Sequence, residues 1–173
     1  MHNKLVSNTC DENVFSVFFK KHATSLRNFL IYKFANEKHA EDITQEAFVK
    51  LWQNCKDVPL EKAKSYIYTI ANNASLNIIT HQKVVLKYSK SNLNLEINNE
   101  SPEFIFEENE FKTKLLTAIE SLSEIHRTTF LMHRIDKKKY SEIAEELNIS
   151  VKTVEKRIHV ALTQLRKNIE GFK

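Results

Sequence analysis

The sequence predicts an all-α protein of two small helical domains joined by a flexible acidic linker, and three observations support this class. A single glycine and two prolines stand among 173 residues, whereas tight β-hairpin turns depend on glycine. Apolar residues recur at three- and four-residue steps, the spacing of one helix face. Charge also divides the chain, because residues 91–110 carry six glutamates and no basic side chain, whereas the net charge of the whole chain is +4.

The acidic segment predicts the domain boundaries. It is rich in Asn and Ser, contains Pro102 and shows weak periodicity, which is typical of a linker. Residues 1–90 and 111–173 are both basic on balance. We therefore expect a first domain at 10–88, a linker at 89–109 and a second domain at 110–170. The alternative is a single helical bundle with a long acidic surface loop.

Composition excludes several function classes. The only glycine, Gly171, lies at the end of the chain, so no glycine-rich phosphate-binding loop exists. No apolar run approaches the ~20 residues of a membrane span, and no secretory signal begins the sequence. An HExxH motif and paired cysteines are also missing, so we expect no metal, no cofactor and no catalytic residues. Cys10 and Cys55 are isolated, which favours reduced thiols in a cytoplasmic protein.

Three helices are predicted in the first domain. One apolar face of the first helix is formed by Phe15, Phe18, Phe19, His22, Leu26, Phe29 and Leu30. A second helix is expected to begin near Ala40, and residues 54–64, which contain Pro59, are expected to form a loop. The third helix is expected to begin at about Ser65 and to carry a polar stripe.

The second domain has the pattern of a helix-turn-helix. A helix over 111–122 is followed by Ser123, which is expected to cap the next helix, and that helix ends at the basic run 137–139. A short apolar face over 143–147, a break at 148–150 and a longer face over 151–165 complete the pattern. Asn148 holds the turn position that favours a positive φ, and Ser150 is expected to cap the last helix.

The exposed positions of that last helix mix cations, hydroxyls and one carboxylate, as reading base edges in a major groove requires. They are Lys152, Thr153, Glu155, Lys156, Arg157 and His159. Lys152 and Arg157 suit contacts with phosphates, which position a helix without reading sequence. The alternative for the same residues is the solvated face of an ordinary helical pair.

Over residues 12–88 and 110–168, the chain resembles the sigma-70 family of RNA polymerase sigma factors, of the small extracytoplasmic-function type. AEDITQEAFVKLWQ resembles the polymerase-binding helix of region 2, and SYIYTIANN resembles its DNA-melting segment, with Tyr66 in place of a Trp. LSEIHRTTFLMHRI and YSEIAEELNISVKTVEKRI resemble region 4. Asn77 and the 79–82 segment depart from the family pattern, so the −10 preference does not carry over. In region 4, Val160 stands where many relatives have Arg, so we expect one phosphate or base contact to be missing there.

The resemblance implies a transcription initiation factor that recognises −35 and −10 promoter elements and helps DNA melting, with no catalysis of its own. It implies that five residues bind the clamp helices of the largest polymerase subunit, namely Asp42, Gln45, Glu46, Phe48 and Trp52. It assigns the −10 element to Lys56, Asp57, Lys64, Asn73, Asn77, His81 and Lys83, with Tyr66 and Tyr68 either stacking on bases or lying in the core. It implies that the −35 element is bound by Ser150, Lys152, Thr153, Glu155, Lys156, Arg157 and His159.

The expected partners are core RNA polymerase, promoter DNA and an anti-sigma factor, which in this family is often membrane-embedded, with no small-molecule substrate. Two alternatives belong to other classes. One is a helix-turn-helix transcription regulator that acts without being a polymerase subunit, and the other is an adaptor or anti-repressor that binds protein through residues 40–54. The features over 40–83 argue against the regulator, which has no use for them.

Overall fold

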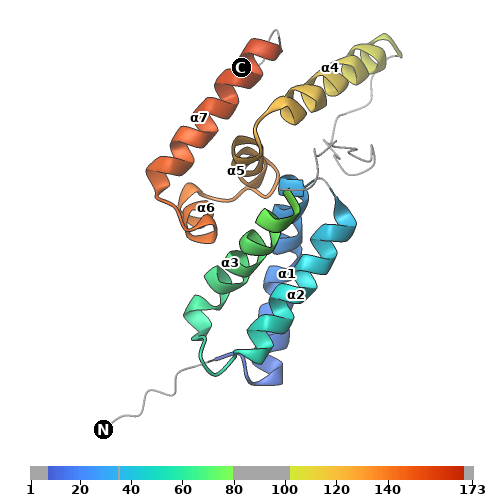
Figure 1. Cartoon of the computed structure of the whole chain (residues 1–173). Helices are drawn as coiled ribbons and strands as arrows, with labels where there is room; N and C mark the ends of the chain where they lie inside the picture. Colours follow the sequence, from blue (N-terminus) through green and yellow to red (C-terminus); the bar gives the residue numbers. More distant parts are fainter. Residues whose placement is uncertain (1–7, 35, 80–101, 170–173) are drawn as a thin grey trace.

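The computed structural model describes residues 8–34, 36–79 and 102–169, with the backbone alone for 75–79 and 102–110. Across these ranges all the regular secondary structure is helical, so the predicted all-α class is confirmed (Figure 1). The helices are α1 (Glu12–Phe34), α2 (Glu37–Gln53), α3 (Leu60–Ile79), α4 (Pro102–Ser121), α5 (Glu124–Arg134), α6 (Tyr140–Leu147) and α7 (Val151–Asn168). None of the helices in these ranges is long and apolar enough to cross a bilayer.

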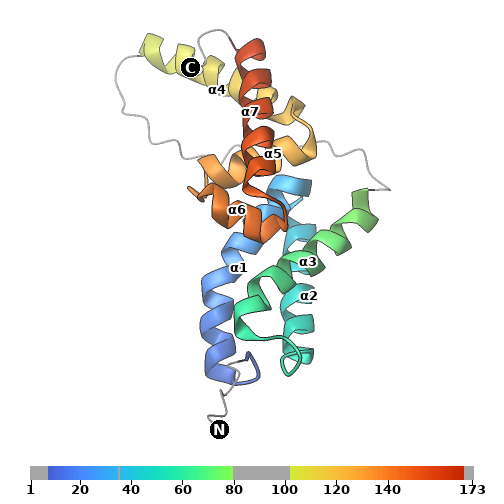
Figure 2. The same ribbon diagram turned by 90° about the vertical axis from the view of Figure 1, so that its left-hand side faces the viewer.

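Helices α1, α2 and α3 pack against one another as a three-helix bundle (Figures 1 and 2). Its centre is apolar and closed to solvent, since Leu26, Leu30, Leu51 and Ile67 are fully buried. At about 1.5–3 kcal/mol for each large apolar side chain removed from water, such side chains supply most of the bundle's stability. The bundle therefore presents α2 and α3 as firm supports for surface side chains.

The helix boundaries in the bundle differ from the prediction. Helix α2 begins at Glu37 because Asn36 caps it, accepting a hydrogen bond from the His39 amide at 3.1 Å. Helix α3 begins at Leu60, five residues before the predicted start. Pro59 is the last residue of the loop, as predicted, and stands directly before the helix, where a missing N–H costs nothing because no intrahelical partner exists. The loop between α2 and α3 is thus only residues 54–59.

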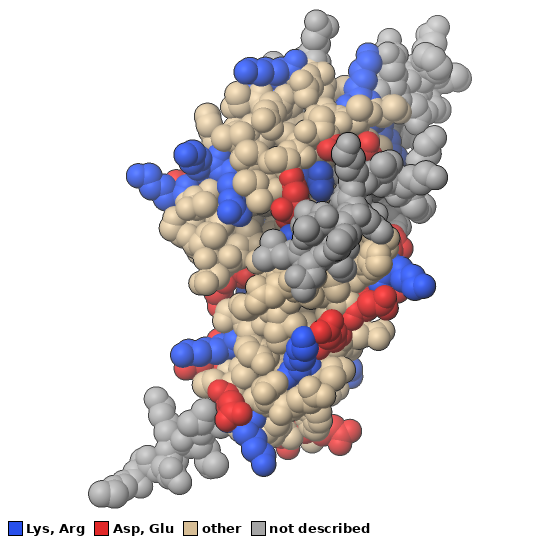
Figure 3. Space-filling view, in the orientation of Figure 1, with Lys and Arg blue, Asp and Glu red and all other residues tan. Residues whose placement is uncertain are grey.

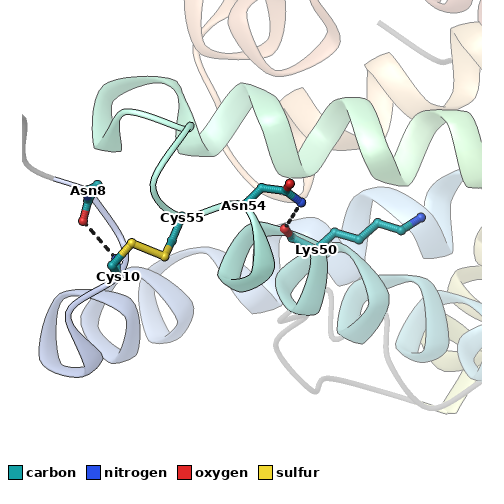
Figure 4. The surroundings of a disulfide bond; sticks show 5 residues. All are labelled: Asn8, Cys10, Lys50, Asn54 and Cys55. Atoms are coloured by element: carbon teal, nitrogen blue, oxygen red, sulfur yellow. Dashed lines mark hydrogen bonds between the residues drawn. A yellow bond between two sulfur atoms is a disulfide. The ribbon is translucent and has the colours of Figure 1, made fainter.

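The cysteine prediction was wrong, because Cys10 and Cys55 form a disulfide (Figure 4). The bond joins the segment before α1 to the loop between α2 and α3. An isolated antiparallel β-bridge between Asn8 and Pro59 lies beside it, and the Asn8 Oδ1 accepts a hydrogen bond from the Cys10 amide at 3.1 Å. The pairing follows from how the helices pack, and a separation of 45 residues carries no local sequence signal for it.

In the second unit, α7 packs against α4, α5 and α6, and α6 and α7 form the predicted helix-turn-helix. Asn148 has φ 52° and ψ 49°, so the predicted positive φ is confirmed. The chain reverses direction there, and the Ile149 amide donates a hydrogen bond to the Ala144 carbonyl at 3.0 Å. Ser150 caps α7 by accepting from the Thr153 amide at 3.2 Å, as predicted.

Two further expectations for this unit are corrected. Ser123 precedes α5 but makes no capping bond with its side chain, because its hydroxyl lies 2.8 Å from the His126 Nδ1 instead. Helix α4 begins at Pro102, nine residues before the predicted start at 111, because proline can open a helix. The linker at 89–109 stays a prediction, and its residues 89–101 lie outside the described residues.

Candidate polymerase and nucleic-acid interfaces

The outer side of α1 and α2 carries an apolar groove of about 560 Å³. Its walls combine aromatic side chains from both helices with two amides and one carboxylate, namely Glu12, Phe15, Phe19, Gln45, Phe48, Val49, Trp52 and Gln53. Trp52 is 42% exposed and packs edge-on against Phe15 with ring centroids 4.9 Å apart. Exposed apolar surface of this kind is typical of a place where a protein, a membrane or a ligand binds.

Of the five residues assigned to polymerase binding, Gln45, Phe48 and Trp52 line the groove, and we call Asp42, Gln45 and Glu46 of α2 its polar rim. Asp42, Gln45 and Glu46 are exposed along α2, and the Glu46 carboxylate lies 2.6 Å from the Lys50 ammonium in the next turn. Trp52 closes one wall of the groove. Phe48, in contrast, is 3% exposed, so it supports the groove from beneath.

The sequence prediction missed the contribution of α1 to this groove. Phe15 and Phe19 were assigned to a core stripe, yet Phe19 is 41% exposed and packs against Phe48 at 4.8 Å between ring centroids. Val49, an apolar position of α2, is 53% exposed. The sequence held no signal for this, because Phe15, Phe18 and Phe19 at positions i, i+3 and i+4 share one helix face of ordinary width.

The α2–α3 loop and the first turns of α3 hold the described candidates for −10 recognition. Lys56 and Asp57 are exposed on the loop, which is held by the disulfide and by a 3.0 Å bond from the Asp57 amide to the Asn54 carbonyl. Asn73 is exposed further along α3. Asn77 lies where only the backbone is described, and His81 and Lys83 lie outside the described residues.

For Tyr68 the structure favours the core over stacking on bases. Tyr68 is 2% exposed, packs on Phe29 and shares a 2.9 Å hydrogen bond with the Ser25 hydroxyl. Burial, followed by the neighbouring Glu146 carboxylate, raises the pKa of the Tyr68 phenol far above its usual value. Tyr66 is half-buried against the same core, so both alternatives stay open for it.

Lys64 is also engaged. Its ammonium lies 3.1 Å from one Glu146 oxygen and 3.7 Å from a Glu145 oxygen, both on α6, and its side chain is only 22% exposed. A cation assigned to DNA is therefore paired with carboxylates of the helix-turn-helix unit.

The residues assigned to the −35 element gather at the start of α7. Lys152, Glu155, Lys156 and His159 are exposed, together with Ser150 in the turn, whereas Thr153 and Arg157 are half-buried. Figure 3 shows Lys and Arg side chains projecting from the molecule over this end of α6 and α7. This combination of a protruding helix, exposed cations and one carboxylate suits a major groove.

Burial lowers the pKa of His126 on α5, and the nearby Arg157 cation on α7 lowers that pKa further. Among the described side chains, no group of three His, Cys, Asp or Glu residues is placed to hold a metal ion.

Two family descriptions match the chain, Sigma-70 region 2 over residues 18–84 and Sigma-70, region 4 over residues 112–165. The ECF RNA polymerase sigma factor SigW of Bacillus subtilis is 28% identical over 158 residues, covering 83% of this chain and 82% of that protein. The ferric citrate uptake sigma factor FecI of Escherichia coli is 25% identical over 150 residues, covering 86% of each.

Other matches differ in extent. The ECF RNA polymerase sigma factor SigE of Mycolicibacterium smegmatis is 24% identical over 140 residues, and the match spans about half of that protein (54%) but 79% of this chain. Among solved structures, CnrH in complex with the cytosolic domain of CnrY superposes with a TM-score of 0.59 at 17% identity, covering 91% of this chain and 88% of CnrH. That likeness concerns the fold.

Proposed function

Since this chain belongs to the sigma-70 family of RNA polymerase promoter-specificity factors, in its extracytoplasmic-function group, we propose that it binds core polymerase through the α1–α2 groove and reads promoter DNA through α3 and α7. One observation carries the proposal above all. The chain combines a half-open aromatic groove with an exposed helix-turn-helix, and a regulator that binds DNA alone has no use for the groove.

At the groove, aromatic side chains supply the binding energy and the rim supplies orientation. Trp52 and Phe19 offer amphipathic or apolar rings that lose water when a partner helix covers them. Asp42, Gln45 and Glu46 offer carboxylates and an amide along the same helix. A partner with apolar anchors and basic side chains fits this arrangement, and we assign it to the clamp helices of the largest polymerase subunit.

At the −35 element, the start of α7 enters the major groove. Glu155, Lys156 and His159 read base edges, where a carboxylate accepts from a cytosine amino group and an ammonium donates to guanine. Lys152 and Arg157 bind phosphates, and the Ser150 and Thr153 hydroxyls lie at the helix N-terminus, where backbone amides favour an anion.

At the −10 element, the α2–α3 loop receives a base extruded from the non-template strand, with Lys56 and Asp57 as its contacts. Asn73, Asn77, His81 and Lys83 follow the strand along α3 and the residues after it, and Lys64 joins them once it is released from α6. Unstacking a base costs a few kcal/mol, which contacts in the loop must offset. The chain itself catalyses nothing, and nucleotide addition belongs to the polymerase.

The remaining elements of the proposal concern partners and place. CnrH is solved with the cytosolic domain of CnrY, which supports a regulatory protein partner of the anti-sigma kind for this chain, membrane-anchored or not. A protein that works on polymerase and promoter DNA acts in the cytoplasm. The domain division at 10–88, 89–109 and 110–170 remains part of the proposal.

Affinity for purified core RNA polymerase tests the groove assignment. Replacing Trp52 with Ala removes an aromatic anchor, and we expect a loss of about 2 kcal/mol or more, roughly 30-fold in Kd, by the usual effect of such residues. The matched control is Val17→Ala, which removes a 68% exposed apolar side chain of α1 that lies outside the groove. Equal affinity of both variants and wild type would refute the assignment.

A further inference from the structure

The Cys10–Cys55 disulfide lies at one end of the α1–α2 groove. Cys10 stands two residues before Glu12, which begins α1 and lines the groove. Cys55 stands two residues after Gln53, which ends α2 and also lines the groove. Figure 4 shows the bond joining the segment before α1 to the turn that follows α2. The bond therefore ties together the two helix ends between which the groove opens.

The groove end of α1 depends on this bond because its own side chains are not buried. Residues 11–17 are all exposed or half-buried, and Phe18 is the first buried side chain of the helix. Within this stretch, Phe15 packs on Trp52 at 4.9 Å and on Phe48 at 6.2 Å between ring centroids. A helix end with few buried contacts opens locally at a low cost in free energy. The disulfide thus supplies much of the restraint that keeps this end beside α2.

The segment that carries Cys10 contains a buried group that favours its release. Thr9 is fully buried, and among the described residues its hydroxyl has no hydrogen-bond partner. A buried hydroxyl without a partner is destabilising, and release into water removes that cost. The β-bridge between Asn8 and Pro59 opposes release, as does the disulfide. Breaking the disulfide therefore shifts the balance toward departure of this segment from the loop.

The α2–α3 loop, in contrast, keeps its shape without the bond. The Asn54 carbonyl accepts from the Asp57 and Val58 amides at 3.0 and 3.2 Å. The Asn54 side-chain amide donates to the Lys50 carbonyl at 2.8 Å, and Val58 is 6% exposed. Loss of the disulfide consequently acts on the groove end of α1 and leaves the loop in place.

The bond is open to thiol–disulfide exchange, since Cys10 and Cys55 are only half-buried. A thiolate of a dithiol protein of the thioredoxin class forms a mixed disulfide with one sulfur and expels the other as a thiolate, which takes up a proton. The second thiol of the reductant then breaks the mixed disulfide. Two electrons and two protons pass to the cysteine pair, and the reductant leaves as its own disulfide.

A hydroperoxide supplies the reverse reaction. One cysteine is oxidised to a sulfenic acid as hydrogen peroxide is reduced to water, and the second cysteine displaces another water to restore the disulfide. A protein that works on polymerase and promoter DNA meets the cytosolic thiol pools, where disulfides are usually transient and either catalytic or redox-sensing. A separation of 45 residues differs from the CxxC pair of disulfide oxidoreductases, which favours sensing.

We propose that Cys10 and Cys55 form a redox-sensing site. Oxidation by a hydroperoxide closes the end of the polymerase groove, and reduction by a dithiol protein loosens it. The consequence for polymerase rests on the proposed function, whereas the exchange chemistry is a property of the free chain. A loosened groove is competent for only part of the time, and the apparent affinity falls by that fraction.

The oxidised and reduced forms of the full chain test the site. Oxidised protein is treated with reduced thioredoxin, its thiols are counted by alkylation and mass spectrometry, and hydrogen peroxide is then added to regenerate the bond. Far-UV circular dichroism, amide hydrogen exchange and affinity for purified core RNA polymerase are measured for both forms. The matched control is Cys10→Ser/Cys55→Ser, which receives the same reagents but cannot form the bond. Residues 26–34, in the buried half of α1, are the internal control for exchange.

We expect thioredoxin to reduce most of the protein and peroxide to restore the bond. Reduction should speed exchange at residues 8–17 but not at 26–34, and it should weaken binding to core polymerase by about fivefold or more. The serine variant should bind as the reduced protein does, whichever reagent it receives.

Three results would overturn the redox-sensing site, namely a bond that resists thioredoxin, a reduced protein that unfolds, and equal affinities of the two forms for polymerase. Binding to polymerase in neither form would refute the proposed function instead. Hydrogen exchange then decides the site by itself, because exchange at residues 8–17 that does not rise on reduction contradicts it.

Discussion

The left-handed conformation of Asn148 sets the direction in which α7 leaves α6, and three substitutions there measure its energetic value. With φ 52° and ψ 49°, any residue with a Cβ is crowded against the following carbonyl, at a cost of about 1–2 kcal/mol. Asn reduces this cost by local hydrogen bonding, and Gly avoids it. The side chain is exposed, so substitution removes little packing.

We therefore expect Asn148→Gly to keep the free energy of unfolding within about 0.5 kcal/mol of wild type. Asn148→Ala should lose about 1 kcal/mol, and Asn148→Val, with its branched Cβ, up to about 2 kcal/mol. For a chain of this size, each kcal/mol lowers Tm by about 2–4 °C. Thermal and urea unfolding followed by far-UV circular dichroism measure these differences.

Asn13→Val is the control, because Asn13 is exposed in the first turn of α1 and has no positive φ. We expect it to change stability by no more than about 0.5 kcal/mol. If Asn148→Val unfolds at the same temperature and urea concentration as Asn148→Gly, the backbone reasoning is refuted.

Three further predictions concern DNA, the disulfide and pH. Lys156→Ala should weaken binding to −35 DNA by ~1–3 kcal/mol and alter its sequence preference, whereas Lys152→Ala should weaken binding to all sequences and flatten the salt dependence. Reducing the Cys10–Cys55 bond should lower the free energy of unfolding by up to about 4 kcal/mol, the chain-entropy value for a separation of 45 residues. Stability should fall as pH falls below about 6.5, because burial, followed by Lys64, lowers the folded-state pKa of His22 and the unfolded chain then binds the proton more readily; His22→Gln should reduce that slope.

Each of these has a contradicting outcome. Equal effects of the two lysine variants on cognate and scrambled DNA, measured by anisotropy, would remove the division between base and phosphate contacts. A Cys10→Ser/Cys55→Ser variant that matches the oxidised protein in urea unfolding would show that the disulfide adds no stability. A stability profile between pH 5 and 7.5 that is the same with and without His22 would show that this histidine does not carry the acid sensitivity.

The local features of the second unit were predictable because their signals lie within a few residues. The break around Asn148 and the cap at Ser150 depend on backbone geometry that neighbouring residues determine. The same reasoning failed at Ser123, where a histidine one turn later competes for the hydroxyl. Capping propensity identifies the position of a helix start but not the partner of the side chain.

The periodicity of apolar residues could not predict the groove or the contact between the two units. A stripe that contains Phe15, Phe18 and Phe19 indicates an apolar helix face but does not say which edge of it stays open. The pairing of Lys64 with Glu146 and the Cys10–Cys55 bond join residues 82 and 45 positions apart, and only the packing of helices brings them together. Residue type indicated the chemistry of these side chains, whereas their partners depended on the tertiary fold.

Promoter-specific transcription by a reconstituted holoenzyme tests the central claim most directly. Core RNA polymerase is mixed with this protein and genomic DNA fragments of its own organism, and the 5′ ends of the transcripts are sequenced. We predict discrete start sites that share upstream −35 and −10 sequences, appear only with the protein and weaken with Trp52→Ala. Start sites identical to those of core polymerase alone, together with no co-purification of the two, would contradict the account.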